Sequence, residues 1–146
     1  MFTSILVPVD FSEGSSAALR LAVRLARAHK ARLTLLHVGV TAQAVGVETF
    51  GMPVPQVFVE LNDQLARERQ HALEKLAREE VPEDVPRALV VRDGYPPEEI
   101  LAQAETGGHD LLVMATHGRT GLKRVLLGSV AERVLRSCPI PVLVTR

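Results

Sequence analysis

Five short apolar segments, separated by stretches of helical periodicity, constrain the fold of this chain more than any other feature. The segments are 5–7, 33–38, 88–91, 111–114 and 141–144. Each is nearly continuous in apolar residues, which is typical of strands that are buried on both faces. Strands of this kind that alternate with helices predict an α/β fold with a parallel sheet and right-handed crossovers. With 146 residues, the chain is expected to form a single domain over 1–146.

Helical patterns fill the gaps between these strands. They cover 15–30, 56–80, the stretch from Pro96 to Gly107, and 129–136. In the first helix, the stripe expected to face the core holds Ala18, Leu21, Ala22 and Leu25. The segment 39–55 is rich in Gly, Thr, Val and Pro. Because it is too long for a plain connector, it is interpreted as a flexible loop, or flap.

Composition narrows the range of functions. Lys and Arg together number 17, as do Asp and Glu, and this zero net charge argues against a general nucleic-acid binder. No apolar stretch reaches the roughly 18 residues that a bilayer requires. Met1–Ser4 lead directly into the first strand without a signal-peptide pattern. We therefore expect a cytoplasmic protein that binds neither nucleic acid nor a membrane. The single Cys138 allows no intrachain disulfide and is interpreted as a small buried side chain.

The residues that follow the strands are the candidates for ligand binding. Open α/β sheets bind ligands beyond the carboxyl ends of their strands, where the strand order reverses. Asp10 directly follows the first predicted strand. Its carboxylate can accept hydrogen bonds from a sugar hydroxyl or an exocyclic amine, or hold a metal. The alternative is that Asp10 caps or orients the helix that follows.

The segment 115–129 is the most informative in the chain. Gly118 and Gly121 allow the backbone to turn sharply and approach a ligand closely. Gly128 and Ser129 open the last helix, and a helix N-terminus favours anions. The segment contains no Walker A sequence, and the first strand is not followed by the glycine-rich turn of dinucleotide-binding folds. These features suggest a phosphate-binding segment that is neither a Walker A loop nor a dinucleotide-binding turn.

Charged and capping residues in the same segment have two interpretations. Arg119, Lys123 and Arg124 add positive charge beside the predicted cradle, which suits a triphosphate. Alternatively, Arg119 and Lys123 are solvated surface residues. Ser129 and Glu132 have the spacing of a capping box, so Ser129 is also interpreted as an N-cap, a role that does not exclude a phosphate contact.

Several motifs together carry a family resemblance over essentially the whole chain. They are Val7-Pro8-Val9-Asp10-Phe11-Ser12, Leu35-Leu36-His37-Val38, Gly94-Tyr95-Pro96 with Glu98-Glu99-Ile100, 116–122, 126–132 and 138–144. With these motifs the chain resembles the universal stress protein family. The ATP-binding branch of that family carries the pattern G-x2-G-x9-G-[ST]. Gly118, Gly128 and Ser129 match this pattern, and Ala115 stands in place of its first glycine.

The resemblance implies a fold, a ligand and an assembly. The fold is a three-layer, adenine nucleotide alpha hydrolase-like domain with helices on both faces of a five-stranded parallel sheet of order 3-2-1-4-5. The ligand is ATP, with Mg²⁺ or Mn²⁺ on its triphosphate. The residues implied to bind it are Pro8, Val9, Asp10, Val38, Met114, Ala115, Thr116, His117, Gly118, Arg119, Thr120, Gly121, Gly128, Ser129, Val130 and Ala131. The assembly is a homodimer through the last strand, an edge with no later element to cover it.

No convincing catalytic set is visible in the sequence. His117 lies in the proposed site without a carboxylate near it in sequence, and is interpreted as holding its loop. His37 lies inside a buried strand and is interpreted as a satisfied core histidine. Three hypotheses remain. The favoured one is a nucleotide-dependent sensor or regulator in a stress response, with an unknown protein partner. The others are a slow ATPase, since a bound triphosphate needs only a positioned water, and a protein-interaction module that binds no nucleotide.

Overall fold

The observed elements alternate strand and helix along the whole chain, as predicted. The computed structural model describes residues 1–40, 56–117 and 127–146, without the side chains of 56–58. The elements are β1 (Ser4–Pro8), α1 (Glu13–His29), β2 (Arg32–Gly39), α2 (Gln56–Glu80), β3 (Arg87–Asp93), α3 (Pro96–Thr106), β4 (Leu111–Ala115), α4 (Ser129–Ser137) and β5 (Val142–Thr145). The five strands form one parallel sheet in the order β3-β2-β1-β4-β5, which confirms the predicted fold. Nearly all of the predicted loop 39–55 lies outside the described residues.

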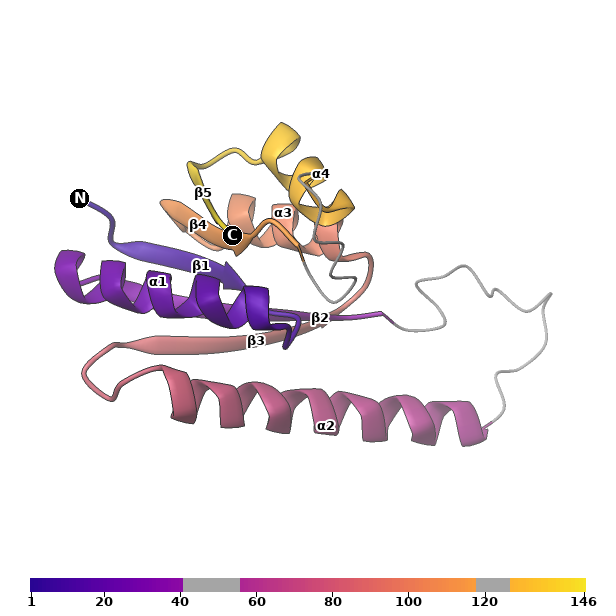
Figure 1. Ribbon diagram of the computed structural model, residues 1–146. Helices are drawn as coiled ribbons and strands as arrows, with labels where there is room; N and C mark the ends of the chain where they lie inside the picture. Colours follow the sequence, from indigo (N-terminus) through magenta and orange to yellow (C-terminus); the bar gives the residue numbers. More distant parts are fainter. Residues whose placement is uncertain (41–55, 118–126) are drawn as a thin grey trace.

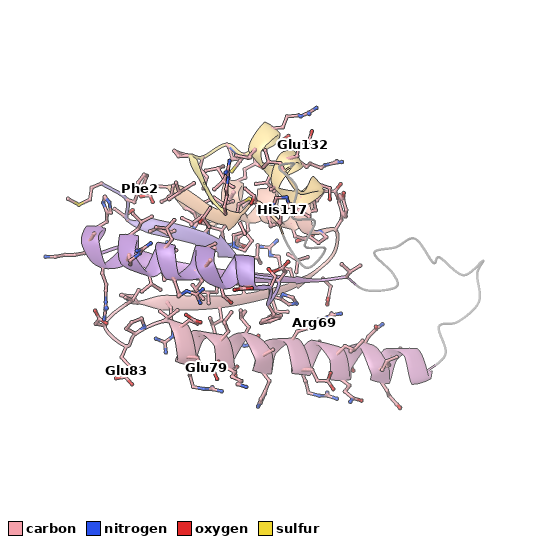
Figure 2. The ribbon with its side chains drawn as sticks, in the orientation of Figure 1. Phe2, Arg69, Glu79, Glu83, His117 and Glu132 are labelled. Carbon is pink, nitrogen blue, oxygen red and sulfur yellow. The ribbon has the colours of Figure 1, made fainter. Side chains whose placement is uncertain are left out.

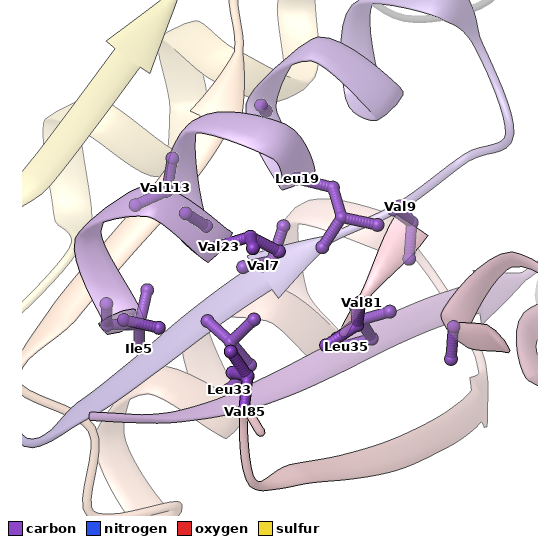
Figure 3. Close-up of a cluster of buried hydrophobic side chains, with 14 of the residues drawn as sticks. Ile5, Val7, Val9, Leu19, Val23, Leu33, Leu35, Val81, Val85 and Val113 are labelled. Atoms are coloured by element: carbon purple, nitrogen blue, oxygen red, sulfur yellow. The ribbon is translucent and has the colours of Figure 1, made fainter. Parts of the chain in front are cut away.

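Helices cover both faces of the sheet and give three layers (Figure 1). Because successive strand residues point to opposite faces, each central strand supplies two cores. Ile5, Val7 and Leu35 belong to the larger core cluster, which also holds residues of α1 and α2. Figure 3 shows these three side chains together with Leu19 and Val23 of α1. Leu6 and Leu36 point to the other face and pack with residues of α3 and α4. The half-buried Cys138 also packs against this second cluster.

Burial on both faces holds for the central strands and fails at the two edges. β1, β2 and β4 are almost fully buried, whereas most residues of β3 and β5 are only partly covered or exposed. The prediction from continuous apolar runs was therefore wrong for these edges, because the helices cover the middle of the sheet more completely than its margins. Leu143 on β5, for example, is exposed. No helix in the described ranges is long and apolar enough to span a membrane.

Helix α1 begins earlier and faces the core differently than predicted. Ser12 is its N-cap, with Oγ accepting a hydrogen bond from the Ser15 N–H at 3.2 Å, so the helix starts two residues before the expected Ser15. Its buried residues are Ser15, Ala18, Leu19, Ala22, Val23 and Ala26. Leu21 and Leu25, which were expected in the stripe, are only partly buried. The stripe is rotated because α1 packs on β1 and β4, a contact that helical periodicity alone does not define.

Candidate functional site

A cavity of about 260 Å³ opens beyond the carboxyl ends of β1 and β4. These neighbouring strands lie where the strand order reverses, since the chain passes from β1 to β2 on one side and returns to β4 on the other. β1 and β4 form bridge pairs at only two positions, Ile5 with Leu111 and Leu6 with Leu112. Both strands then continue towards the cavity. The cavity therefore lies where ligands of open α/β sheets are expected.

All predicted site residues in the described part of the chain line this one cavity. They are Pro8, Val9, Asp10, Val38, Met114, Ala115, Thr116, His117, Gly128, Ser129, Val130 and Ala131. The remaining predicted residues, Gly118, Arg119, Thr120 and Gly121, lie outside the described residues, as do Lys123 and Arg124. The structure thus brings together the strand ends that sequence reasoning selected.

Four further residues line the cavity and were missed: Ser15, Leu36, Pro96 and Ile100. Ser15 belongs to the first turn of α1, and Pro96 begins α3 after β3. Pro96 and Ile100 are four residues apart, so they lie on one face of α3. That spacing was a usable signal in the sequence. The spacing did not reveal that this face of α3 also borders the cavity beyond β1 and β4, in addition to packing on the core.

The turn from β1 to α1 places Asp10 in the cavity wall. Its Oδ1 accepts hydrogen bonds from the Ser12 N–H at 3.0 Å and from the Ser12 hydroxyl at 2.5 Å. Ser12 in turn caps α1. Asp10 therefore orients the capping residue, which was the structural alternative considered for it, and it also lines the cavity.

The end of β4 is held against the start of α4 by backbone contacts. The Thr116 N–H donates to the Thr145 carbonyl oxygen at 2.9 Å, and the Thr116 carbonyl oxygen accepts from the Gly128 N–H at 2.8 Å. A Cβ on Gly128 would lie 3.0 Å from that carbonyl oxygen. Gly128 has an ordinary φ of −62°. Close approach of two backbones, rather than an unusual turn, explains the glycine at this position.

Helix α4 presents an N-terminus without a side-chain cap to the cavity. Its N-cap is Gly128, so Ser129 is the first helical residue, and the predicted capping box is wrong. The Glu132 carboxylate pairs with Arg136 at 2.9 Å instead of reaching back to the helix start. A Cβ at position 128 would make a tight contact of 3.0 Å with the Thr116 carbonyl oxygen, which favours glycine as the cap residue. The first-turn N–H groups therefore have no capping side chain, which suits an anion.

His117 lines the cavity and His37 lies behind it, and the two rings differ in how their nitrogens are hydrogen-bonded. His37 is 7% exposed, and its Nδ1 lies 2.8 Å from the Val9 carbonyl oxygen, as expected for a satisfied core histidine. His117 lines the cavity, and its Nδ1 lies 3.0 Å from Thr116 Oγ1. Its Nε2 is buried and has no hydrogen-bond partner in the structure as described. A local contact with Thr116 agrees with a role in holding the loop, and Nε2 remains a buried polar atom at the cavity.

The cavity combines an apolar floor with few charged groups. Among the described residues that line it, Asp10 is the one carboxylate and His117 the one imidazole. Within 1–40, 56–117 and 127–146, no group of three or more His, Cys, Asp or Glu side chains could hold a metal ion. Apolar walls with a small number of converging polar groups are typical of small-molecule sites. The fold and site thus define an α/β protein with a cavity at the switch point of its sheet.

Comparison with known proteins identifies the family. The sequence model of the universal stress protein family matches residues 1–146, and the chain belongs to this family. It is 34% identical to universal stress protein YxiE of Bacillus subtilis over the full length of both chains. The structure of MJ0577 from Methanocaldococcus jannaschii superposes with a TM-score of 0.82, at 34% identity and covering 99% of this chain and 96% of that one. Universal stress protein UspA of Lactobacillus plantarum superposes with a TM-score of 0.76, at 29% identity over 99% of this chain and 97% of that one.

Proposed function

We propose that this universal stress protein binds ATP in the cavity beyond β1 and β4 and acts as a nucleotide-dependent regulator in a stress response. The observation that carries the proposal is the convergence of three segments on one cavity. They are the Asp10 turn, the end of β4 from Met114 to His117, and the first turn of α4. The sequence independently indicates a nucleoside contact at the Asp10 turn and a phosphate cradle in the other two segments.

The residues present fit an adenine nucleotide in two respects. The apolar lining from Val9, Val38 and Met114 suits a flat base, and Asp10 offers a carboxylate to a sugar hydroxyl or an exocyclic amine. A volume of about 260 Å³ is close to the lower end of small-molecule sites, about 300 Å³, which suits the nucleoside part of the ligand. The phosphates would extend towards the N-terminus of α4, where the first-turn N–H groups lack a capping side chain.

The same residues do not fit a metal held by the protein alone. With one carboxylate among the described lining residues, a divalent cation would be coordinated chiefly by phosphate oxygens. We therefore place Mg²⁺ or Mn²⁺ on the triphosphate. When bound, the ion would neutralise phosphate charge, while the backbone of α4 and the 115–117 segment would orient the chain of phosphates.

Two solved structures of the same fold are complexes with adenine nucleotides. One is a universal stress protein in complex with cAMP, and the other is the universal stress protein of Archaeoglobus fulgidus in complex with dAMP. Both are 21% identical to this chain, so they contribute the fold and leave its ligand to be tested directly. We rank ATP above AMP because the uncapped α4 N-terminus suits additional phosphates.

The test is calorimetric titration of nucleotide-free protein with ATP, AMP and GTP in the presence of Mg²⁺. We expect micromolar binding of ATP and weaker binding of AMP and GTP. A Gly128→Val variant should lose ATP binding, because its side chain would collide with the Thr116 carbonyl oxygen and displace the start of α4. Ala88→Val, at an exposed position on the edge strand β3, is the matched control and should bind as the unmodified protein does.

Failure of all three nucleotides to bind would refute the proposal and favour a protein-interaction module. Phosphate release that is proportional to protein concentration and lost in Asp10→Ala would instead favour slow ATP hydrolysis.

We further propose a cytoplasmic homodimer that pairs through β5. The support is that β5 is an edge strand whose Leu143 is exposed. Light scattering after size exclusion should give twice the mass of the chain, and Leu143→Lys should halve it. A monomeric mass for the unmodified protein would contradict this assembly.

A further inference from the structure

Phe11 has a backbone conformation that an L-amino acid rarely adopts. Its φ is 63°, in the left-handed region, where a side chain crowds its own backbone. One other non-glycine residue in the described part of the chain has a positive φ, namely Lys30. Lys30 is the C-cap of α1, a position where this conformation is ordinary. Phe11 ends no helix, so its conformation requires another explanation.

Capping of α1 does not supply that explanation. The N-cap is Ser12, whose φ of −77° and ψ of 161° are relaxed and whose side chain makes the capping hydrogen bond. Phe11 instead lies between Ser12 and Asp10, the residue whose carboxylate lines the cavity. Strained residues persist only where their surroundings define them, and they gather at functional sites.

His37 holds this turn from both sides. The ring of Phe11 packs on the ring of His37, with centroids 4.6 Å apart and an angle of 44° between the planes. His37 Nδ1 lies 2.8 Å from the carbonyl oxygen of Val9. Because a carbonyl oxygen only accepts, Nδ1 carries a proton and donates it. His37 thus contacts the residue before Asp10 through a hydrogen bond and the residue after it through its ring.

We propose that Phe11 and His37 are positioning residues that fix the Asp10 carboxylate for ligand binding. The proposal rests on the proposed nucleotide site. Val9 and Phe11 flank Asp10 in the chain, and both are fixed to one buried ring on β2. With its two neighbours fixed, Asp10 has little freedom to leave the cavity wall, where it also accepts two hydrogen bonds from Ser12.

The first test compares Mg²⁺–ATP affinity among variants of the turn. Phe11→Ala keeps the backbone strain and loses the ring contact. Phe11→Gly also loses the ring but relieves the strain. It can therefore replace the alanine variant in the test if Phe11→Ala does not fold. We expect both variants to bind ATP more weakly, by roughly 2- to 12-fold. This range is the free energy of one aromatic ring contact converted into a change in dissociation constant. His37→Asn keeps a donor near the position of Nδ1 and should lose less affinity than His37→Leu.

The chain offers a matched control for loss of a phenylalanine–histidine contact. Phe2 packs on His29 with ring centroids 5.3 Å apart, beyond the N-terminal end of β1 and away from the cavity, whereas His117 marks the cavity end of the sheet (Figure 2). Phe2→Ala should therefore reduce stability and leave ATP affinity unchanged. If Phe11→Ala and Phe11→Gly both bind ATP as tightly as the unmodified protein, or if Phe2→Ala weakens binding equally, the positioning role is refuted.

A second measurement tests the turn without any ligand. The Ser12 N–H donates to Asp10 Oδ1, so its hydrogen exchange reports whether the carboxylate is held in place. We expect faster exchange at Ser12 in Phe11→Ala and in His37→Leu, and no change in Phe2→Ala. If the unmodified protein binds no ATP, the proposed function fails and this exchange experiment alone decides the inference. Unchanged exchange at Ser12 in both turn variants would then overturn it.

Discussion

Mild acid is expected to destabilise this protein through His109. The ring is 7% exposed, at the end of the sheet opposite the cavity. Its Nδ1 lies 2.9 Å from Ser4 Oγ, which also accepts from Arg32 Nε at 3.1 Å. Its Nε2 lies 3.3 Å from the amide nitrogen of Gln103, whose Oε1 accepts from an Arg92 nitrogen at 2.7 Å. The Gln103 amide therefore donates to Nε2, and a neutral ring with its proton on Nδ1 satisfies every partner.

Protonation of His109 would place a second N–H against the Gln103 amide donor. Burial lowers the pKa of His109 from its usual value, the positive charge of Arg32 lowers it further, and Asp110 opposes the change. The unfolded chain, with a histidine pKa of about 6.5, then takes up a proton at higher pH than the folded chain does. The stabilisation from neutral His109 is therefore complete at pH values above the pKa of this histidine in the unfolded chain. It is lost progressively as the pH falls below that pKa.

The magnitude follows from this difference in proton uptake. One group changes the free energy of unfolding by at most about 1.4 kcal/mol per pH unit. If folded His109 stays neutral throughout, lowering the pH from about 7.5 to about 5.5 removes about 1.4 kcal/mol, because the unfolded histidine protonates over this interval. The total free energy of unfolding of a natural domain is about 5–15 kcal/mol, so a change of this size is measurable by urea unfolding.

The assay is urea unfolding at several pH values for the unmodified protein, for His109→Gln and for His71→Gln. His71 is exposed on α2 and serves as the control. His109→Gln should lose most of the dependence between about pH 7.5 and 5.5, whatever its stability at neutral pH, and His71→Gln should keep it. The reasoning fails if His109→Gln retains the dependence of the unmodified protein.

Three further substitutions test the packing described above. Gly128→Ala places a Cβ 3.0 Å from the Thr116 carbonyl oxygen, and calorimetry should show weaker ATP binding together with about 1–3 kcal/mol of lost stability. Leu36→Ala empties a fully buried position below the cavity and should cost about 2–5 kcal/mol in urea unfolding. Asp84→Asn removes the exposed ion pair with Arg27 and should leave the thermal midpoint within experimental error, since exposed pairs contribute little.

The strands were predictable from their apolar runs, and their order in the sheet was predictable from the resemblance to the universal stress protein family. Continuous apolar runs defined β1, β2 and β4 closely, since these strands are buried on both faces. The turns after the strands were selected by the rule that ligands bind where the strand order reverses, and the full set of site residues came from the family resemblance. Residues directly after the strands, such as Asp10 and Thr116, therefore came together as expected.

What the sequence did not reveal depends on contacts between distant segments. Gly128 rather than Ser129 caps α4 because the backbone passes close to Thr116, twelve residues earlier. Ile100 faces the cavity because of how α3 is oriented over the sheet. The positive φ of Phe11 was not predictable either, since nothing in its residue type suggests it and its ring contact with His37 joins segments that are distant in the chain.

The central place of β1 in the sheet has a consequence for synthesis of the protein. β1, β2 and β3 are complete once Asp93 has been made, but the other edge of β1 is covered only by β4, which ends at Ala115. At about 5–20 residues per second, the ribosome needs roughly 1–4 s to add these 22 residues. During that interval the nascent chain presents an apolar strand of five residues with one unpaired edge, which a chaperone or a neighbouring nascent chain can reach before β4 does.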